Sequence, residues 1–94
     1  MGSIILTTKN NNIVDYDEAE ELVVYDMDSR KIVARLKKPS DPSLIEDLLE
    51  EHDPWIIVSG SMSPEVAEVL RDIGVKIEIT NGGKLEDYIS EVFV

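Results

Sequence analysis

The chain has 94 residues, enough for one domain, and its hydrophobic fraction of 43% is that of a globular protein. It contains no cysteine, which excludes disulfides, thiolate zinc sites and cysteine-ligated iron–sulfur clusters. Nine basic residues stand against twenty acidic ones, and the net charge of −11 disfavours nucleic acids and anionic membrane surfaces as partners. Because it has neither a signal sequence nor an apolar run of the roughly 18 residues that a membrane helix needs, we expect a cytoplasmic protein.

The first half of the chain predicts three strands. A continuous apolar run, Ile4 to Leu6, is typical of a strand buried on both faces, so we expect a strand over 3–8, followed by a turn at the three asparagines. Runs rich in β-branched residues over 22–25 and 32–36 predict a hairpin. The basic residues near its second strand alternate with apolar ones, which favours a solvated strand side over a binding patch: Arg30, Lys31, Arg35, Lys37 and Lys38.

The second half alternates helices with strands. Asp41 suits an N-cap and Pro42 a first helical position, so we expect a helix that ends near His52. Residues 55–58 predict a buried strand in which Trp55 fills core or interface space. Ser63, Pro64 and Gly74 predict the cap, the first residue and the left-handed end of a second helix, respectively.

The last part of the chain predicts an edge strand and a short helix. Apolar and charged residues alternate over 75–79, which indicates one wetter face. A turn at 81–83 precedes a helix whose apolar stripe is Leu85, Tyr88, Ile89 and Val92. The element order β-β-β-α-β-α-β-α predicts a mixed five-stranded α/β sheet of order 3-2-1-4-5 with an antiparallel second strand. Right-handed crossovers place the first two helices on one face and leave the other to the last helix.

Two stretches of this pattern resemble a known family. The run WIIVSGSMSPEVAEVLRDIGVKIEI from Trp55, followed by Asn81-Gly82-Gly83, is similar to the nitrogenase iron–molybdenum cofactor biosynthesis family. The hairpin LVVYDMDSRKIV resembles that family's second and third strands. The resemblance covers nearly the whole chain. It implies a ribonuclease-H-like three-layer fold and a domain that binds, carries or helps assemble metal–sulfur cofactors.

The chain departs from this family where a cluster would be held. The family often has His-Phe-Gly-Arg-Ala before the second strand, and the corresponding residues here are Asp15-Tyr16-Asp17-Glu18-Ala19. Carboxylates thus replace an imidazole at Asp15 and a guanidinium at Glu18. The loop over 38–42 also lacks the family's histidine. Because iron–sulfur clusters are usually anionic and take thiolate or imidazole ligands, we expect this site to hold one poorly.

The candidate site lies at the carboxyl ends of the parallel strands, where ligands bind in open α/β sheets. Hydroxyl groups, glycines and helix N-termini meet there and could cradle a small anionic ligand or a metal cofactor. The candidate residues are Thr8, Ser59, Gly60, Ser61, Met62, Asn81, Gly82 and Gly83. The same residue types also form ordinary turns and caps, and the sequence leaves that alternative open. No metal ligand can be assigned, and the cofactor is unknown.

Catalysis is not expected, because no pair of residues has the type and spacing of a general acid and base. The acidic residues over 15–21 lack the spacing of a calcium loop, and Asp26 and Asp28 fall in the hairpin turn. Two functional hypotheses follow. The first is a non-catalytic domain that binds a metal cofactor or a small anion at the strand-end loops. The alternative is a degenerate family member that acts as a protein-interaction or dimerisation module through an edge strand such as 75–79.

Overall fold

Strand β1 (Ser3–Lys9) forms the centre of the sheet, as its continuous apolar run predicts. The structure is a computed structural model that describes residues 2–41 and 44–93. β3 (Glu21–Asp26) pairs with β1 in antiparallel orientation along its length, and β5 (Pro54–Ser59) pairs with it in parallel on the other side. β1 is therefore buried from residue 4 to residue 8.

The outer strands complete a mixed sheet. β4 (Lys31–Lys37) pairs with β3 in antiparallel orientation, and β6 (Lys76–Ile79) pairs with β5 in parallel. The five long strands thus have the neighbours that the sequence predicts. Within the described residues β6 has no second neighbour, so it is the expected edge strand.

Over the described residues the sheet has seven strands rather than five, so its full order differs from the predicted 3-2-1-4-5. The two additional short strands, β2 (Asn12–Ile13) and β7 (Gly83–Lys84), lie where the sequence indicated turns. Asn10 and Asn11 have φ of 52° and 62°, the left-handed values of a tight hairpin turn that asparagine tolerates. β2 returns along β1 beyond the end of β5, β7 pairs with β2, and the sheet therefore branches at β1.

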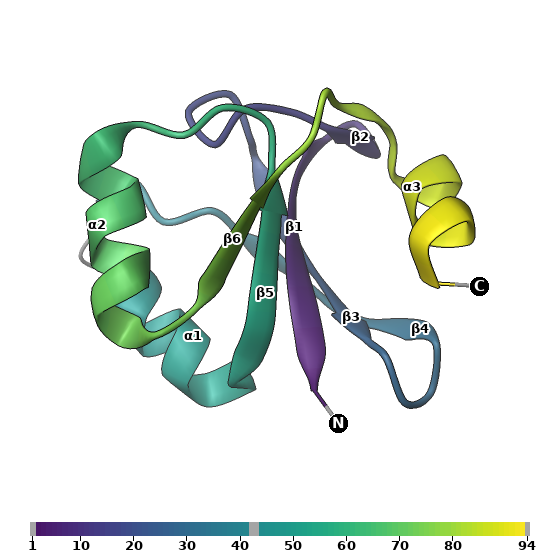
Figure 1. The fold of residues 1–94 in the computed structure, drawn as a ribbon, viewed down its shortest axis with the longest axis horizontal. Helices are drawn as coiled ribbons and strands as arrows, with labels where there is room; N and C mark the ends of the chain where they lie inside the picture. The colour runs from purple at the N-terminus through teal and green to yellow at the C-terminus, as the bar shows by residue number, and fades with distance from the viewer. Residues whose placement is uncertain (1, 42–43, 94) are drawn as a thin grey trace.

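In the part of the chain that the structure describes, three helices cover the sheet, α1 (Ile45–His52) and α2 (Pro64–Ile73) on one face and α3 (Leu85–Phe93) on the other, as predicted (Figure 1). Alternate residues of β1 point to opposite faces. Ile5 accordingly joins the core under α1 and α2, whereas Ile4 and Leu6 join the core under α3. No helix in the described ranges is long and apolar enough to cross a membrane.

The ends of the helices test the predicted caps. Ser63 caps α2 by accepting from the Val66 N–H, and Gly74 ends it with φ of 93°, as expected. The predicted start of α1 is wrong, since the helix begins at Ile45 and its N-cap residue is Leu44 rather than Asp41. The predicted roles of Pro42 and of the Val92 side chain fall outside the part of the chain described.

Trp55 is an exception to the predicted burial of β5. Ser3 pairs with Pro54 while Ile4 pairs with Ile56, so Trp55 is the additional residue of a β-bulge. Its side chain is 61% exposed, so it does not fill the core of this chain. The basic residues of the hairpin lie on its solvated side as predicted, and Lys38 among them is half-buried.

Candidate functional site

A hollow of about 480 Å³ lies at the carboxyl ends of β5 and β6. It forms where three segments meet: the loop after β2, the loop between β5 and α2, and the loop after β6 (top of Figure 1). Its walls are Ile13, Val14, Asp15, Glu18, Gly60, Ser61, Ile79, Thr80, Asn81 and Gly82. The predicted location of the site therefore coincides with a real depression in the surface.

Four of the eight candidate residues line this hollow: Gly60, Ser61, Asn81 and Gly82. Thr8 and Ser59 are fully buried in the sheet instead. The Thr8 hydroxyl points to the Glu21 carbonyl at 3.4 Å, and Ser59 Oγ lies 3.0 Å from Thr7 Oγ1. These two hydroxyls serve the interior of the sheet and are not available to a ligand.

The remaining two candidates, Met62 and Gly83, also lie away from the hollow. Met62 packs against the core under α2 and lines a different depression beside β6. Gly83 belongs to β7, where it pairs with Ile13 with φ of 113°. Its role is a backbone conformation that other residues rarely adopt.

The loop between β5 and α2 is already bonded to the loop after β2. The Ser61 N–H donates to Asp15 Oδ1 over 2.7 Å, and the Tyr16 N–H donates to the Ser61 carbonyl over 3.1 Å. The Gly60 N–H donates to the Val14 carbonyl over 3.0 Å. Ser61, a candidate for binding an external anion, therefore donates its amide to a carboxylate of the protein itself.

Gly60 permits this close approach. A Cβ atom at position 60 would lie 2.8 Å from Asp15 N and 3.1 Å from Asp15 Cα, and it would also overlap the Asp15 carboxylate. A side chain at this position would thus push the two loops apart. The glycine, predicted as a ligand-approach residue, instead allows the protein's own backbone to approach.

The charged side chains that line the hollow, those of Asp15 and Glu18, are both acidic. An anionic ligand would therefore meet repulsion rather than a cradle. The atoms that could bind a metal ion here are hydroxyl, amide and carboxylate oxygens. Such ligands suit hard cations and not the soft iron of a sulfur cluster. The described residues include no group of three His, Cys, Asp or Glu side chains that could hold a metal ion.

His52 does not change this conclusion. It ends α1, and its carbonyl accepts from the Ser3 hydroxyl over 3.1 Å at the start of β1. The strand-end hollow lies at the opposite end of β1 and β5. The imidazole is thus too remote to serve as a ligand there, and an iron–molybdenum or iron–sulfur group does not fit the residues present.

Four of the lining residues that were not among the candidates fall into two groups. Asp15 and Glu18 were recognised as departures from the family pattern, and the structure places both in the wall of the hollow. Ile13 and Val14 were missed because β2 was not predicted. The run of three asparagines followed by the β-branched Ile13 and Val14 is the signal for a tight hairpin that could have revealed them.

Tyr16 and Lys38 hold the opposite side of the Asp15 loop. Lys38 Nζ donates to the Tyr16 carbonyl over 2.6 Å and lies 4.9 Å from the centre of the Tyr16 ring. The Tyr16 ring is buried in the core, and burial, with a smaller contribution from Asp17, raises the pKa of its hydroxyl. These contacts are structural, and they fix the loop that places Asp15 on Ser61.

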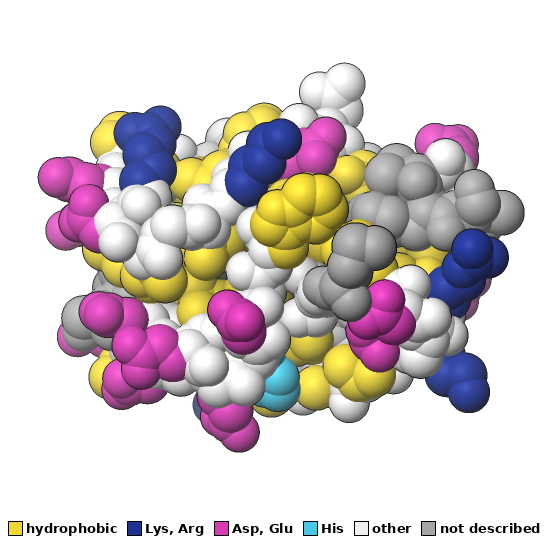
Figure 2. All heavy atoms as spheres, turned by 60° about the horizontal axis from the view of Figure 1, so that its bottom comes forward, with side chains coloured by type: hydrophobic (Ala, Val, Ile, Leu, Met, Phe, Trp, Pro, Cys, Tyr) yellow, Lys and Arg dark blue, Asp and Glu magenta, His cyan; other side chains and the backbone are white. Residues whose placement is uncertain are grey.

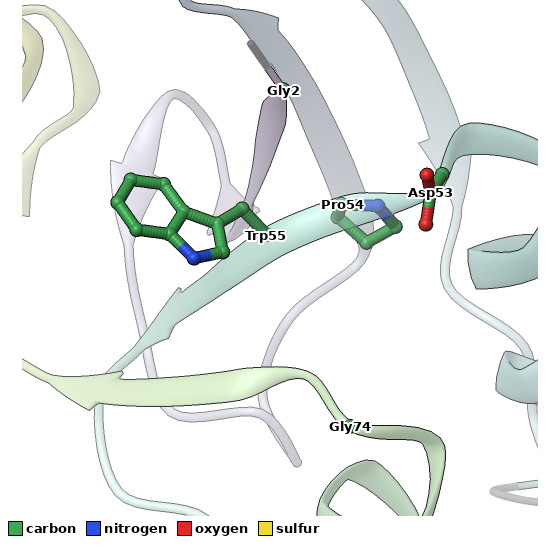
Figure 3. A pocket seen from close by; sticks show the side chains of 5 residues that line it. All are labelled: Gly2, Asp53, Pro54, Trp55 and Gly74. Atoms are coloured by element: carbon green, nitrogen blue, oxygen red, sulfur yellow. The ribbon is translucent and has the colours of Figure 1, made fainter.

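A second hollow, of about 450 Å³, lies at the opposite end of β5. Its walls are Gly2, Asp53, Pro54, Trp55 and Gly74, and Figure 3 shows the Trp55 indole projecting away from Asp53. Figure 2 shows apolar side chains lying open among acidic ones on this side of the molecule. Since no set of polar groups converges there, the strand-end hollow remains the better candidate for a ligand.

Comparison with known proteins supports the fold. No family model matches the chain, and no curated protein matches it. The crystal structure of PH0822 is similar with a TM-score of 0.77 and 12% identity, over 97% of this chain and 89% of that one. The NMR structure of TM1290 from Thermotoga, provisionally named a NifB protein and belonging to the DUF35 family, is similar with a TM-score of 0.73 and 18% identity, over 98% of this chain and 90% of that one. At such identities the likeness establishes a shared fold alone.

Proposed function

We propose that this chain is a non-catalytic, cytoplasmic protein-interaction module. The observation that carries the proposal is that two outer strands of the sheet, β4 and β6, present apolar side chains beside an edge that no strand of the described residues covers. Val33 on β4 is 56% exposed and Ile79 on β6 is 58% exposed. An open strand edge offers unpaired backbone groups to another strand, and adjacent apolar side chains add burial to such a pairing. The net charge of −11 favours a protein partner over nucleic acid or a membrane.

We infer a distant relationship to the nitrogenase-cofactor family, with a ribonuclease-H-like sheet that has lost the cluster-holding role. The neighbours of the five long strands and the name given to the Thermotoga protein support the relationship. The Asp15 carboxylate on the Ser61 amide supports the loss, because it occupies the donor that an anionic group would need. In this proposal the chain shares the fold of the family, but its surface no longer holds a cluster.

A second candidate function is the binding of a small molecule in the strand-end hollow. It is favoured by the meeting of four predicted residues around about 480 Å³ of space. The carboxylates of Asp15 and Glu18 would select a neutral or cationic ligand rather than the anionic one that the sequence suggested. Iron–sulfur chemistry is not part of this candidate.

Anaerobic reconstitution separates these functions from the family's role. The wild-type chain is incubated with iron and sulfide, and separately with molybdate, and bound metal, absorbance and Tm are measured. We expect a colourless protein with unchanged Tm, because the hollow lacks soft ligands. Asp15→Asn tests the hollow, and Asp53→Asn is the matched control at the far end of β5. Stoichiometric iron that Asp15→Asn abolishes and Asp53→Asn retains would restore the cofactor hypothesis.

Partner binding is tested on the strand edge itself. The full chain is used as bait in native extract, in parallel with Ile79→Lys and with Glu50→Lys, a larger charge change of the same sign on the exposed side of α1. We expect a partner, which includes further copies of the bait, to be lost with Ile79→Lys and kept with Glu50→Lys. Absence of any partner, or equal loss with both variants, would refute an interaction role for this edge.

A further inference from the structure

The free edge of β6 has a defined pattern of backbone groups. The Thr80 N–H donates to the Ser59 carbonyl over 2.9 Å, so the backbone groups of Thr80 point toward β5. Because these directions alternate along a strand, those of Lys76 and Glu78 also face β5. The N–H and C=O groups of Ile77 and Ile79 therefore face outward, where no strand of this chain covers them in the described residues.

The side chains of β6 divide between two faces. Ile77 packs against the core under α2, and Ile79 follows on the same face by alternation. Both line a hollow of about 410 Å³ together with Met62 and Ala67. Lys76 and Glu78 lie on the other face, both exposed, and neither forms an ion pair within the described part of the chain.

Resting on the proposed function, we propose that the partner is a second copy of this chain, which pairs its β6 with this β6 in antiparallel orientation about a two-fold axis between the two Ile77 residues. The outward groups of Ile77 then form a reciprocal hydrogen-bonded pair. The same register places Lys76 opposite the partner's Glu78 and Glu78 opposite the partner's Lys76. A symmetric interface repeats every contact, so both opposite-charge pairs form.

Charge makes this register selective. A two-fold axis at Lys76 would bring two lysines together, and an axis at Glu78 would bring two glutamates together. Directly opposed like charges destabilise a strand pair, whereas directly opposed opposite charges stabilise it. An axis at Ile79 would leave Lys76 and most of the strand unpaired. The order Lys-Ile-Glu-Ile thus complements itself only when centred on Ile77.

The apolar face supports the same arrangement. In this register Val75 lies opposite the partner's Ile79, so each exposed isoleucine gains an apolar neighbour. A two-fold axis perpendicular to the sheet keeps both α2 helices on one face, and the hollow beside β6 is then covered by the other copy. Ile79, the most exposed large aliphatic side chain among the described residues, becomes buried at each end of the apolar strip that the two Ile77 residues centre.

The overall charge of the chain opposes the association. Two copies of net charge −11 repel each other, and this repulsion is screened beyond about 8–10 Å at physiological ionic strength. An interface built on a four-residue strand is also small. We therefore expect a weak dimer. Its populated fraction should rise with protein concentration, and its dissociation constant should fall with moderate salt.

A charge swap tests this register in the full-length chain. Dimerisation is measured by sedimentation velocity for wild type, Lys76→Glu, Glu78→Lys and the double variant, with circular dichroism to verify folding. Each single variant puts like charges opposite each other, so we expect the dissociation constant to rise by about tenfold or more for both. The double variant, and an equimolar mixture of the two single variants, restore the opposite pairs and should dimerise like wild type.

The single variants also separate the register from net charge. If overall repulsion alone governed association, Glu78→Lys would strengthen the dimer while Lys76→Glu weakened it. A dimer that responds in that way, or that ignores both changes, overturns the proposal. A chain that is monomeric at all concentrations and salts overturns it as well, and a foreign partner lost with Ile79→Lys would then still support the interaction role.

Discussion

At the scale of single residues, Gly60 shows how tightly the loops around the hollow approach each other. In Gly60→Ala the new methyl group would meet the backbone of Asp15 at 2.8 Å. Because backbone cannot rotate away as a side chain can, we expect a loss of about 1–3 kcal/mol in the free energy of unfolding, measured by urea denaturation.

A comparison glycine isolates this steric cost. A Cβ atom at Gly74 meets nothing within 4 Å, but φ is 93°, so Gly74→Ala pays only backbone strain of about 1–2 kcal/mol. Replacing Asp15 by alanine should not change the cost of Gly74→Ala. It should lower the cost of Gly60→Ala only in part, because the backbone of Asp15 remains in place. A Gly60→Ala protein as stable as wild type would contradict the loop packing described.

Tyr16 carries the clearest pH dependence. Its buried hydroxyl has no hydrogen-bond partner in the described structure, and burial raises its pKa. A pKa that is raised in the folded state contributes stability at pH values below the pKa of tyrosine in the unfolded state, about 10. This contribution is lost as the pH rises through the pKa of the folded state. Tyr16→Phe should be as stable as wild type or slightly more stable at neutral pH, since the lost hydroxyl had no partner.

Thermal unfolding between neutral and alkaline pH checks this expectation. Tyr16→Phe should lose less stability than wild type above the tyrosine range, because it has no proton to release there. Tyr88→Phe is the comparison, since the pKa of the half-buried Tyr88 is also raised, by burial and then by Glu78. If Tyr16→Phe lost more stability than wild type at alkaline pH, the raised pKa of Tyr16 would be contradicted.

At the scale of elements, α2 depends on its first turn. The Ser63 side chain accepts from the Val66 N–H, and Ser61 two residues earlier contributes its backbone rather than its hydroxyl to the packing. Ser63→Ala should therefore cost about 0.5–2 kcal/mol in urea unfolding, and Ser61→Ala should cost little. Equal effects would show that the cap does not stabilise the helix.

Strand β5 illustrates how far periodicity carries an element-level prediction. Its apolar run identified a strand, and the strand is present from Pro54 to Ser59. The bulge that exposes Trp55 arises from the pairing of Ser3 with Pro54 and of Ile4 with Ile56. Of the two expected places for this side chain, the core is excluded and an interface stays a prediction; the bulge was not foreseen because register depends on the neighbouring strand and not on the run itself.

At the scale of the whole molecule, the excess of acidic residues should make stability depend on salt. Repulsion among these charges opposes the folded state, and added sodium chloride screens it. We expect Tm to rise between low and physiological ionic strength, by about 4–8 °C for each kcal/mol of repulsion removed. Differential scanning calorimetry at low protein concentration measures this without the contribution of a dimer.

Charge variants provide the control for this salt effect. Glu50→Lys and Glu68→Lys change exposed positions on α1 and α2, so together they should reduce the salt dependence. Glu50→Asp with Glu68→Asp keeps the charge and should leave the dependence unchanged. A Tm that falls with added salt would mean that attractive pairs outweigh repulsion.

Fold and site differed in how much could be predicted. The neighbours of the long strands, the faces covered by the helices and the caps of α2 follow from apolar period and local cap residues. The two short strands did not follow, because pairs of two residues have no period to detect. At the site, Gly60 and Asn81 were identified from the rule that ligands bind at strand ends, and Asp15 and Glu18 from the family comparison, whereas Ile13 and Val14 were missed.

By itself the sequence determined an acidic α/β domain with a central buried strand, because hydrophobic period and composition are properties of neighbouring residues. Only the tertiary structure decided that Asp15 binds the Ser61 amide, a contact between residues 46 positions apart. It also decided that Thr8 and Ser59 turn into the sheet and that Trp55 turns out of it. Such outcomes depend on register and on loop approach across the fold, and local pattern contains neither.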